Sequence, residues 1–394
     1  MDGVKYMFKY YLTKIVRTIL KLLYIFPEKK NRVLFYSFSG KDFSDSPKYI
    51  SEYIEENNNK RYELVWAINN PRNFQYLVNR GYKVIKYNSL SHLYYGITSK
   101  FIITNTGPYK ALEYRRSQIV INTWHGGGAY KKTGRDNPYK DKYKRLYNEN
   151  FGQSGVKLFL SSSKAFTKYV IKGAYGYEGE IAEIGLPRND ILFKVNEHIR
   201  IESEVKRQLN IKNNEKILLF APTWRNYETN NYEEIEVDKL LKACKERFGG
   251  DWVFVFRGHN LSNGVPYISK ESHCINATSY YDMQRLLIAS EALVSDYSSC
   301  IWDFSLMKKP CFLYTPDLQK YIQTFAFYTP IYCWGFSVCE SNEELVASIK
   351  KFNMESYYAC IDKNHNLFGD SETGTAIEYV YKYIVNENKS GEMV

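Results

Sequence analysis

Short apolar runs alternate along most of the chain with segments in which apolar residues recur at helical spacing. Apolar runs bounded by polar and turn-forming residues are typical of buried strands, and the segments between them are long enough for crossover helices. The alternation therefore predicts an α/β fold, with a parallel sheet covered by helices on both faces. In the first part of the chain, strands are predicted at 33–38, 63–68, 83–87, 101–104, 119–122, 158–161 and 181–184, and helices at segments such as 47–56 and 73–79.

A second series of strands begins after the polar, charged stretch at residues 194–215. Its strands are predicted at 216–221, 252–256, 292–294 and 311–314. Two such series predict two doubly wound, Rossmann-like domains, residues 29–190 and 191–394, which face a central cleft. Ligands of doubly wound sheets bind beyond the carboxyl ends of the strands, so the loops at those ends are where chemistry is expected.

Residues 1–28 precede both series and have the pattern of an amphipathic helix. Basic residues fill much of the remaining surface, and Asp2 is the only acid before Glu28. This pattern favours a helix that lies in the headgroup region of an anionic membrane. The alternative is a helix docked on the protein's own body, which would usually mix acids with its bases. The apolar positions at helical spacing are Phe8, Tyr11, Leu12, Ile15, Ile19, Leu22, Leu23 and Phe26.

Other features of the sequence narrow the functional classes. No run of 18 apolar residues predicts a transmembrane helix, and the N-terminus lacks the pattern of a signal peptide. The net charge of +11 indicates an anionic partner, but without a basic tail or a recognisable module we expect no nucleic acid. Seven cysteines without a CxxC pair favour reduced, cytoplasmic thiols. No acid cluster has metal-ligand spacing, so we expect no obligatory metal and no cofactor.

A Ser-rich turn follows the predicted strand at 292–294. Ser295, Asp296, Ser298 and Ser299 favour the start of a helix, and an apolar, helix-like segment continues through Met307. Free backbone N–H groups and hydroxyls at a helix start can bind an anion such as a phosphate. A capped helix without a ligand is the ordinary alternative.

Three further loops with polar or glycine residues directly follow predicted strands. They are 123–134, with His125 before three glycines, 221–225, and 256–260, with Arg257 and His259. Each loop alone has an ordinary explanation, because a histidine after a strand is more often a structural hydrogen-bonding residue. Together, two histidines, arginines and a hydroxyl-rich helix start at one edge can hold a diphosphate and deprotonate a hydroxyl beside it.

The order of these motifs resembles that of a known family. The motifs occur in this order: Trp124-His125-Gly126 with Lys131 to Gly134, Leu186-Pro-Arg-Asn-Asp190, Ala221-Pro-Thr-Trp-Arg225, Arg257-Gly-His259, and Ser295-Asp-Tyr-Ser-Ser299 with Asp303. The series, which runs from about residue 30 to 385, resembles the CDP-glycerol glycerophosphotransferases, which include teichoic acid primases and polymerases. The resemblance implies a GT-B-like fold, a CDP-linked donor and a peripheral location at the cytoplasmic face of the cell membrane.

The resemblance also implies roles for individual residues. His125 is expected to be the general base, and the catalytic residues are predicted to be His125 and His259. The diphosphate is expected to contact Arg257, His259, Ser298 and Ser299, while Asp303 would bind a hydroxyl or orient its loop. The predicted substrate-binding residues are Trp124, Gly126, Lys131, Arg188, Pro222, Thr223, Arg225, Arg257, Asp296, Ser298, Ser299 and Asp303.

The implied reaction moves glycerol phosphate from CDP-glycerol to a hydroxyl and releases CMP. The expected acceptor is a lipid-linked polyprenyl-diphosphate saccharide or a polyol phosphate, in teichoic acid or capsule polymer synthesis. The chain departs from the family pattern at Asn260, where proline is common, and at Gly126-Gly-Gly128, where Gly-Thr is common. These departures leave CDP-ribitol open as the donor. A nucleotide-sugar glycosyltransferase of the same fold is the second alternative.

Overall fold

The computed structural model describes residues 2–57, 61–137, 142–223, 235–258 and 274–390, and these form two compact units. Unit 1 comprises Met1–His125, Lys132–Asp190 and Asp370–Val394. Unit 2 comprises Gly126–Lys131 and Ile191–Gly369. Each unit contains one parallel sheet, so the predicted α/β, GT-B-like class with two doubly wound domains is confirmed.

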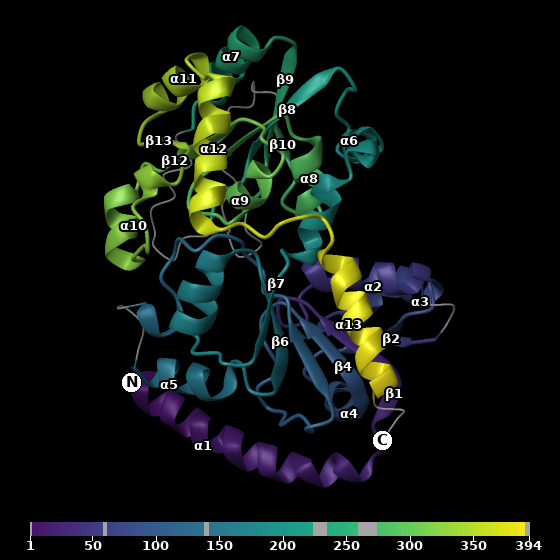
Figure 1. The fold of residues 1–394 in the computed structure, drawn as a ribbon. Helices are drawn as coiled ribbons and strands as arrows, with labels where there is room; N and C mark the ends of the chain where they lie inside the picture. Colours follow the sequence, from purple (N-terminus) through teal and green to yellow (C-terminus); the bar gives the residue numbers. More distant parts are fainter. Residues whose placement is uncertain (1, 58–60, 138–141, 224–234, 259–273, 391–394) are drawn as a thin grey trace. The chain divides into compact units, whose positions relative to one another are not determined.

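Unit 1 is built on a seven-stranded parallel sheet in the order β3-β2-β1-β4-β5-β6-β7 (Figure 1). Its strands are β1 (Lys29–Tyr36), β2 (Glu63–Ile68), β3 (Lys83–Lys86), β4 (Ser99–Thr104), β5 (Ile119–Asn122), β6 (Val156–Ser161) and β7 (Glu180–Glu183). Its helical segments are α1 (Asp2–Leu20), η1 (Lys21–Ile25), α2 (Asp45–Asn57), η2 (Pro71–Phe74), α3 (Gln75–Asn79), α4 (Leu90–Thr98), η3 (Gly134–Asp136), α5 (Lys142–Phe151), η4 (Phe166–Ala174) and α13 (Ala376–Ser390), and η5 (Pro187–Phe193) continues into unit 2. Each predicted strand of this series overlaps an observed one, with bounds that differ by at most four residues, because buried apolar runs mark parallel strands clearly.

Unit 2 repeats this arrangement with six parallel strands in the order β10-β9-β8-β11-β12-β13. Its strands are β8 (Glu215–Phe220), β9 (Asp251–Phe256), β10 (Cys274–Asn276), β11 (Ala292–Ser295), β12 (Cys311–Tyr314) and β13 (Ser337–Cys339). Its helical segments are α6 (Val195–Gln208), α7 (Val237–Phe248), α8 (Met283–Ala289), α9 (Cys300–Ser305), α10 (Leu318–Thr324), η7 (Ile331–Cys333), α11 (Asn342–Lys350) and α12 (Met354–Phe368). β10 and β13 were not predicted; they are three-residue strands at the two edges of the sheet.

The C-terminal helix α13 belongs to unit 1, whereas the sequence analysis placed all of 191–394 in one domain. Val380 and Ile384 of this helix are fully buried in the unit 1 core. The Asp190 carboxylate accepts hydrogen bonds from the backbone N–H groups of Ala376 (3.2 Å) and Ile377 (2.7 Å). Asp190 therefore fixes the start of α13 on unit 1, in the manner of a helix cap. A helical apolar pattern shows which face is buried but not which sheet covers it.

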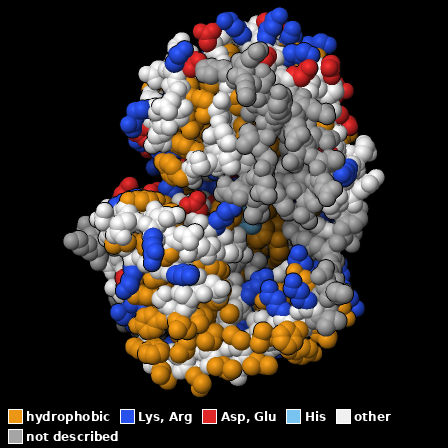
Figure 2. Space-filling view, turned by 180° about the vertical axis from the view of Figure 1, so that it is seen from behind, with side chains coloured by type: hydrophobic (Ala, Val, Ile, Leu, Met, Phe, Trp, Pro, Cys, Tyr) orange, Lys and Arg blue, Asp and Glu red, His pale blue; other side chains and the backbone are white. Residues whose placement is uncertain are grey.

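Helix α1 lies beside α5 along one margin of unit 1, with η1 continuing it (Figure 1). Its inner face is docked: Thr13 Oγ1 lies 3.3 Å from Tyr147 Oη, and Tyr24 Oη donates a hydrogen bond to the carbonyl of Glu113. Figure 2 shows apolar side chains gathered along the same margin. The large apolar residues exposed on this segment are Met7, Phe8, Tyr11, Leu12, Ile15, Ile19, Leu22, Ile25 and Phe26.

Both interpretations of residues 1–28 therefore have support in the structure, because the helix is docked through one face and exposes an apolar stripe on the other. Ile15 and Ile19 each keep 57% of their surface exposed, although burying such side chains is favourable. No helix in the described ranges combines the length and the apolar character needed to cross a bilayer.

Candidate active site

In both units, a polar side chain at the central switch point of the sheet bridges the two strands where the strand order reverses. In unit 1, Asn105 directly follows β4, and its side-chain carbonyl accepts a hydrogen bond from the backbone N–H of Phe38, which lies just after β1 (2.8 Å). In unit 2, Asp296 directly follows β11 and bonds Thr223 after β8. Doubly wound sheets bind ligands outside the carboxyl ends of the strands at this point. Candidate residues adjoin both points: His125 contacts Asn105 in unit 1, and Thr223 and the Ser-rich turn adjoin Asp296 in unit 2.

His125 follows β5 in unit 1, and its ring has a defined tautomer. Its Nδ1 atom lies 2.7 Å from the backbone carbonyl oxygen of Asn105. A carbonyl oxygen can only accept, so Nδ1 carries the proton and Nε2 keeps its lone pair. Burial lowers the pKa of His125, whereas the bond to Asn105 and the charge of Asp45 act to raise it. The ring is therefore neutral near pH 7, and Nε2 can accept a proton.

Arg188 holds the backbone of His125. Its Nη1 donates hydrogen bonds to the carbonyl of His125 (2.6 Å) and to the Asp45 carboxylate (2.9 Å). The side chains of Arg188 and Asp45 are 5% and 7% exposed. Within the same motif, the amide of Asn189 donates to the Glu372 carboxylate at 2.9 Å. This motif therefore fastens together three separate stretches of unit 1.

Trp124 orients the histidine ring that follows it. Its indole stacks on His125 with a centroid separation of 4.5 Å and an interplanar angle of 29°. Its backbone φ of +55° is unusual for a bulky residue, and its N–H donates to the Asn122 side chain at 3.0 Å. The strained turn is thus held by a local hydrogen bond, as is common beside functional residues.

The glycines after His125 pack within unit 2. A Cβ atom on Gly126 would lie 3.2 Å from Ser299 Oγ, and one on Gly128 would lie 2.5 Å from Trp302 Nε1. Further along, Tyr130 Oη donates to the carbonyl of Tyr297 at 3.1 Å. These glycines are required for close packing against α9 and the turn before it, and residues 126–131 belong to unit 2 rather than to the predicted domain 29–190.

Asp296 is engaged by its own unit. Its carboxylate accepts hydrogen bonds from the backbone N–H of Thr223 (2.9 Å), the hydroxyl of Thr223 (2.8 Å) and the backbone N–H of Tyr297. Asp296 is fully buried. The geometry shows both Asp296 and Thr223 as residues that fix the loops after β8 and β11, where Pro222 also lies.

The Ser-rich turn differs from the predicted helix cap. Ser299 occupies the cap position of α9 with helical backbone angles, and its side chain makes no capping hydrogen bond. Ser298 Oγ accepts a long contact of 3.5 Å from the N–H of Cys300, and Ser295 Oγ instead donates to the Ala221 carbonyl. The helix ends at Ser305, before the predicted end at Met307. Ser298 and Ser299 remain partly exposed.

Some of the remaining predicted residues belong to the described ranges, and others lie outside them. Arg257 follows β9, and its Nη1 lies 3.1 Å from the Met283 sulfur. Asp303 is buried and accepts a hydrogen bond from the Gln284 amide at 2.9 Å, which supports an orienting role within α9. The Lys131 ammonium lies 5.5 Å from the ring of Tyr321 in unit 2. His259, Arg225 and Asn260 lie outside the described residues.

Two residues that complete the surroundings of His125 were not predicted from the sequence. Asn105 supplies the carbonyl that sets the tautomer, and Asp45 pairs with Arg188. Asn105 directly follows a correctly predicted strand, so the rule about strand ends could have identified it. Asp45 has a φ of +60°, which no sequence pattern indicated.

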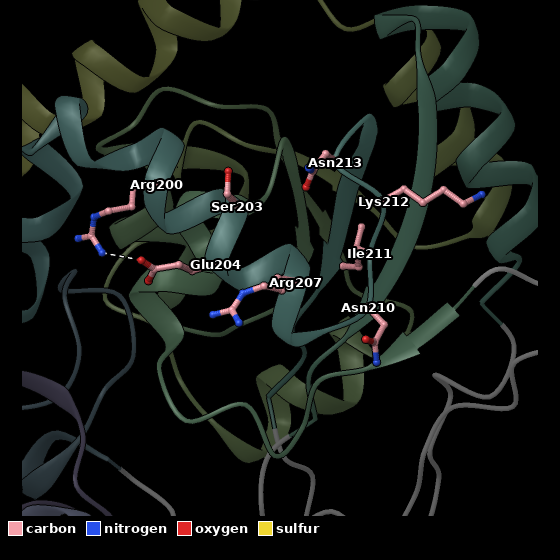
Figure 3. A pocket seen from close by; sticks show the side chains of 8 residues that line it. All are labelled: Arg200, Ser203, Glu204, Arg207, Asn210, Ile211, Lys212 and Asn213. Carbon is pink, nitrogen blue, oxygen red and sulfur yellow. Dashed lines mark hydrogen bonds and ion pairs between the residues drawn. The ribbon is translucent and has the colours of Figure 1, made fainter.

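A surface hollow on unit 2 lies at the wrong edge of its sheet for this chemistry. It is formed by α6 and the segment that leads into β8 (Figure 3). Within it, Arg200 donates to Glu204 at 2.7 Å. The segment precedes β8, so the hollow adjoins the amino end of that strand, and we do not assign it to the active site. Its lining residues are Arg200, Ser203, Glu204, Arg207, Asn210, Ile211, Lys212 and Asn213.

Two doubly wound units, with a neutral histidine and hydroxyl-bearing turns at the carboxyl ends of their strands, define a GT-B-like transferase architecture. The chain belongs to the CDP-glycerol:poly(glycerophosphate) glycerophosphotransferase family, whose model matches residues 18–386. The resemblance inferred from the ordered motifs is thereby confirmed, and the chain is an enzyme of this transferase class.

Related proteins carry either glycerol or ribitol in their names. A teichoic acid poly(glycerol phosphate) polymerase of Bacillus spizizenii is 28% identical over 86% of this chain and 88% of its own length. A teichoic acid ribitol-phosphate primase of the same organism is 25% identical over 82% of this chain and 84% of its own length. Two other glycerol phosphate polymerases are longer, and the chain spans only 50% and 47% of them.

Among solved structures, the wall teichoic acid polymerase TagF has the same fold. One TagF variant superposes with a TM-score of 0.81 at 23% identity and covers 99% of both chains. Another TagF variant, soaked with CDPG, gives a TM-score of 0.80 at 24% identity. The likeness therefore extends over nearly the whole chain and establishes the arrangement of elements.

Proposed function

We propose that this glycerophosphotransferase moves glycerol phosphate from CDP-glycerol to a hydroxyl of a membrane-linked acceptor and releases CMP. The family assignment and the teichoic acid relatives support the donor and the pathway. The structural observation that carries the proposed mechanism is the tautomer of His125, whose Nδ1–H donates to Asn105 and leaves Nε2 unprotonated.

In the proposed reaction, the acceptor oxygen attacks the phosphorus that bears glycerol. The bond from this phosphorus to the oxygen bridging the two phosphates breaks, and CMP leaves with that oxygen. His125 Nε2 takes the proton of the attacking hydroxyl, which makes a poor nucleophile effective near neutral pH. Arg188 and Trp124 position the base, because the former holds its carbonyl and the latter stacks on its ring.

Unit 2 is proposed to hold the donor. Arg257, Ser298 and Ser299 lie after β9 and β11, and their cationic and hydroxyl groups suit a diphosphate. His259 remains a predicted donor contact. Thr223, Asp296 and Asp303 are proposed to shape this site through bonds within unit 2 rather than by touching the donor.

The proposed donor site has a direct test. Ser298→Ala combined with Ser299→Ala should raise the KM for CDP-glycerol severalfold while the melting temperature stays unchanged, because neither hydroxyl is needed to cap α9. Unchanged donor kinetics in a folded double variant would exclude the two hydroxyls from the diphosphate site.

The proposed location is the cytoplasmic face of the membrane, with α1 lying in the headgroup region. The exposed apolar stripe of α1 and its basic flanks provide the two attractions that interfacial helices need. Ile15→Gln with Ile19→Gln should reduce sedimentation with anionic vesicles and leave the fold intact, since both side chains are exposed. Ile199→Gln on α6 is the matched control, because that isoleucine is 79% exposed. Equal binding of all three proteins would show that α1 is not the anchor.

CDP-ribitol is the second candidate donor, supported by the similarity to a ribitol-phosphate primase. Purified enzyme should be incubated with a lipid-linked acceptor and either CDP-glycerol or CDP-ribitol, with the phosphate next to the polyol radiolabelled. Glycerophosphate transfer places this label in the lipid product and releases unlabelled CMP. Label retained on a nucleoside diphosphate would instead indicate a sugar transferase and refute the proposal. Faster turnover with CDP-ribitol than with CDP-glycerol would show that ribitol, not glycerol, is the alcohol that the donor carries.

A further inference from the structure

A second group of charged residues lies in unit 1, away from His125, where α1 meets α5 and the loop that follows β4. We call Lys9, Arg17, Lys110 and Lys144 the basic cluster. Three of its cations stand over aromatic rings: Lys9 and Lys110 lie 5.0 and 5.1 Å from the centroid of Tyr147, and Lys144 lies 6.0 Å from that of Tyr6.

Arg17 adjoins the three lysines through the backbone of Lys110. The residue is only 7% exposed, and its guanidinium lies 4.6 Å from the centroid of the Phe151 ring. Its Nε donates to the Lys110 carbonyl at 2.9 Å, and its Nη1 donates to Ser154 Oγ at 3.0 Å. Its buried Nη2 has no hydrogen-bond partner among the described residues. A buried donor is costly unless an acceptor outside the protein, such as a water molecule or a bound anion, satisfies it.

Lys110 is the most enclosed lysine of the cluster. Its Nζ donates to the Asn148 side chain at 2.6 Å. Burial, together with the smaller effect of the cations of Lys9 and Lys144, lowers the pKa of Lys110 to about 8. Glu113, the acid that acts on Arg17, is paired with Lys21 at 2.8 Å. The cluster therefore gathers mutually repelling cations whose repulsion an anion would relieve.

Docking of α1 alone does not require this arrangement. The hydrogen bonds of Arg17 and Tyr24 already fasten the helix to the body of unit 1. Gathering Lys9 and Lys144 near Lys110 opposes that docking through like-charge repulsion. A site that binds a multiply charged anion accounts for the gathering of the three lysines.

The position of the cluster identifies the source of the anion. Lys9 lies at the flank of the exposed apolar stripe of α1, about 100° round the helix from Phe8. An interfacial helix buries its apolar face below the headgroups, so its flanks lie near the lipid phosphates. Lys110 is also five residues from Asn105, which holds His125, and five residues span at most about 18 Å.

We propose that the basic cluster binds the diphosphate that joins the acceptor to its membrane lipid, so that the acceptor hydroxyl is presented to His125. The inference rests on the proposed function, since it assigns a subsite to the acceptor of that reaction. The occupant is a lipid-borne diphosphate, and the phosphate of ordinary anionic phospholipids is the competing source.

Two kinetic measurements test the site. Lys9→Gln and Lys110→Gln should each raise the KM for lipid-linked acceptor about five- to tenfold, since a lysine near a lipid phosphate contributes about that factor. The KM for CDP-glycerol, and turnover with a soluble acceptor analogue that lacks the diphosphate, should not change. Lys14→Gln is the control, because it removes the same charge from the opposite flank of α1, where Lys14 stands over Tyr10.

A binding measurement separates the two phosphate sources. Wild-type protein and the three variants are sedimented with vesicles that contain either phosphatidylglycerol or polyprenyl diphosphate at matched surface charge. Selective loss of polyprenyl-diphosphate binding by Lys9→Gln and Lys110→Gln supports the proposal. Equal loss on both vesicles, equal loss by Lys14→Gln, or no loss at all overturns it. If the proposed function itself is wrong, wild-type protein will release no CMP with any acceptor, whereas failure of the subsite alone leaves wild-type turnover intact.

Discussion

The bonds of Asp296 predict that this residue stabilises unit 2 and affects the donor only indirectly. Three donors converge on its buried carboxylate: the N–H and hydroxyl of Thr223 and the N–H of Tyr297. Asp296→Ala removes all three bonds and leaves two backbone N–H groups without this acceptor. Each such group costs about 1–3 kcal/mol when buried, so we expect a loss of about 3–5 kcal/mol of unfolding free energy.

Thr223 provides the graded comparison. Thr223→Val removes only the 2.8 Å hydroxyl bond, and a hydrogen bond to a charged group contributes about 1.5–3 kcal/mol. The side chain of Thr223 is partly exposed, so the lower end of that range applies. Thr223→Ser keeps the hydroxyl and should behave nearly as wild type. In the double variant, the two effects should be less than additive, because they share one bond.

Urea unfolding followed by circular dichroism measures these losses, and CDP-glycerol kinetics on the same proteins measures the effect on the donor. We expect Asp296→Asn to lower the midpoint, because its amide N–H₂ would face donors. If Asp296 instead contacted the donor directly, Asp296→Asn would raise the donor KM at an unchanged midpoint. That result would refute the interpretation of Asp296 as a positioning residue.

Three further outcomes follow from the described geometry. His125→Ala should lower turnover about 10²–10⁴-fold while donor binding is retained. Because burial lowers the pKa of His125, the wild-type rate should decrease only when the pH falls below about 6.5. Near-normal CMP release by the variant would show that His125 is not the base. Burial lowers the pKa of His92 to about 4, so between about pH 6.5 and 4 the unfolded chain binds a proton that the folded protein does not. The unfolding free energy should therefore fall by about 3 kcal/mol as the pH drops through that window. The His92→Phe variant cannot titrate at this position, so its urea midpoint should vary less with acid than that of the wild type. Gly128→Ala should destabilise unit 2 by about 1–3 kcal/mol more than Gly249→Ala, because both glycines have a positive φ but only a Cβ at position 128 would meet another atom, Trp302 Nε1 at 2.5 Å. Equal loss of melting temperature in the two variants would refute this steric explanation.

The periodic pattern predicted most of the fold because parallel strands are buried on both faces. β2, β5 and β12 were predicted to the residue, since each is an apolar run with polar neighbours. The edge strands β10 and β13 have three residues each and are only partly buried, so they leave no such signal. Edge strands gain less from apolar side chains, and their pattern is correspondingly weak.

The candidate site was only partly predictable, because motif residues fill different physical roles. Residue type alone identified His125 and Arg188 as candidates for the site. Their hydrogen bonds distinguish the two roles: His125 is set up to accept a proton, and Arg188 holds the backbone of His125. Asp296 was predicted to contact the substrate, and its three internal bonds point to a supporting role instead. Sequence spacing gives proximity at a strand end, but it does not show whether a polar group is already satisfied by its neighbours.

One segment of unit 1 links the two proposed sites. The loop after β4 begins with Asn105, whose carbonyl sets the tautomer of His125, and continues to Lys110, whose carbonyl is held by Arg17 of α1. Along it, the backbone N–H of Tyr109 donates to Tyr36 Oη at 2.9 Å, which ties the loop to the end of β1. A shift of α1 at the membrane would therefore act on the same loop that orients the base. In the proposed arrangement, acceptor capture and base orientation share one loop that is held at both ends, and its rigidity favours a fixed distance between the lipid diphosphate and the reacting hydroxyl.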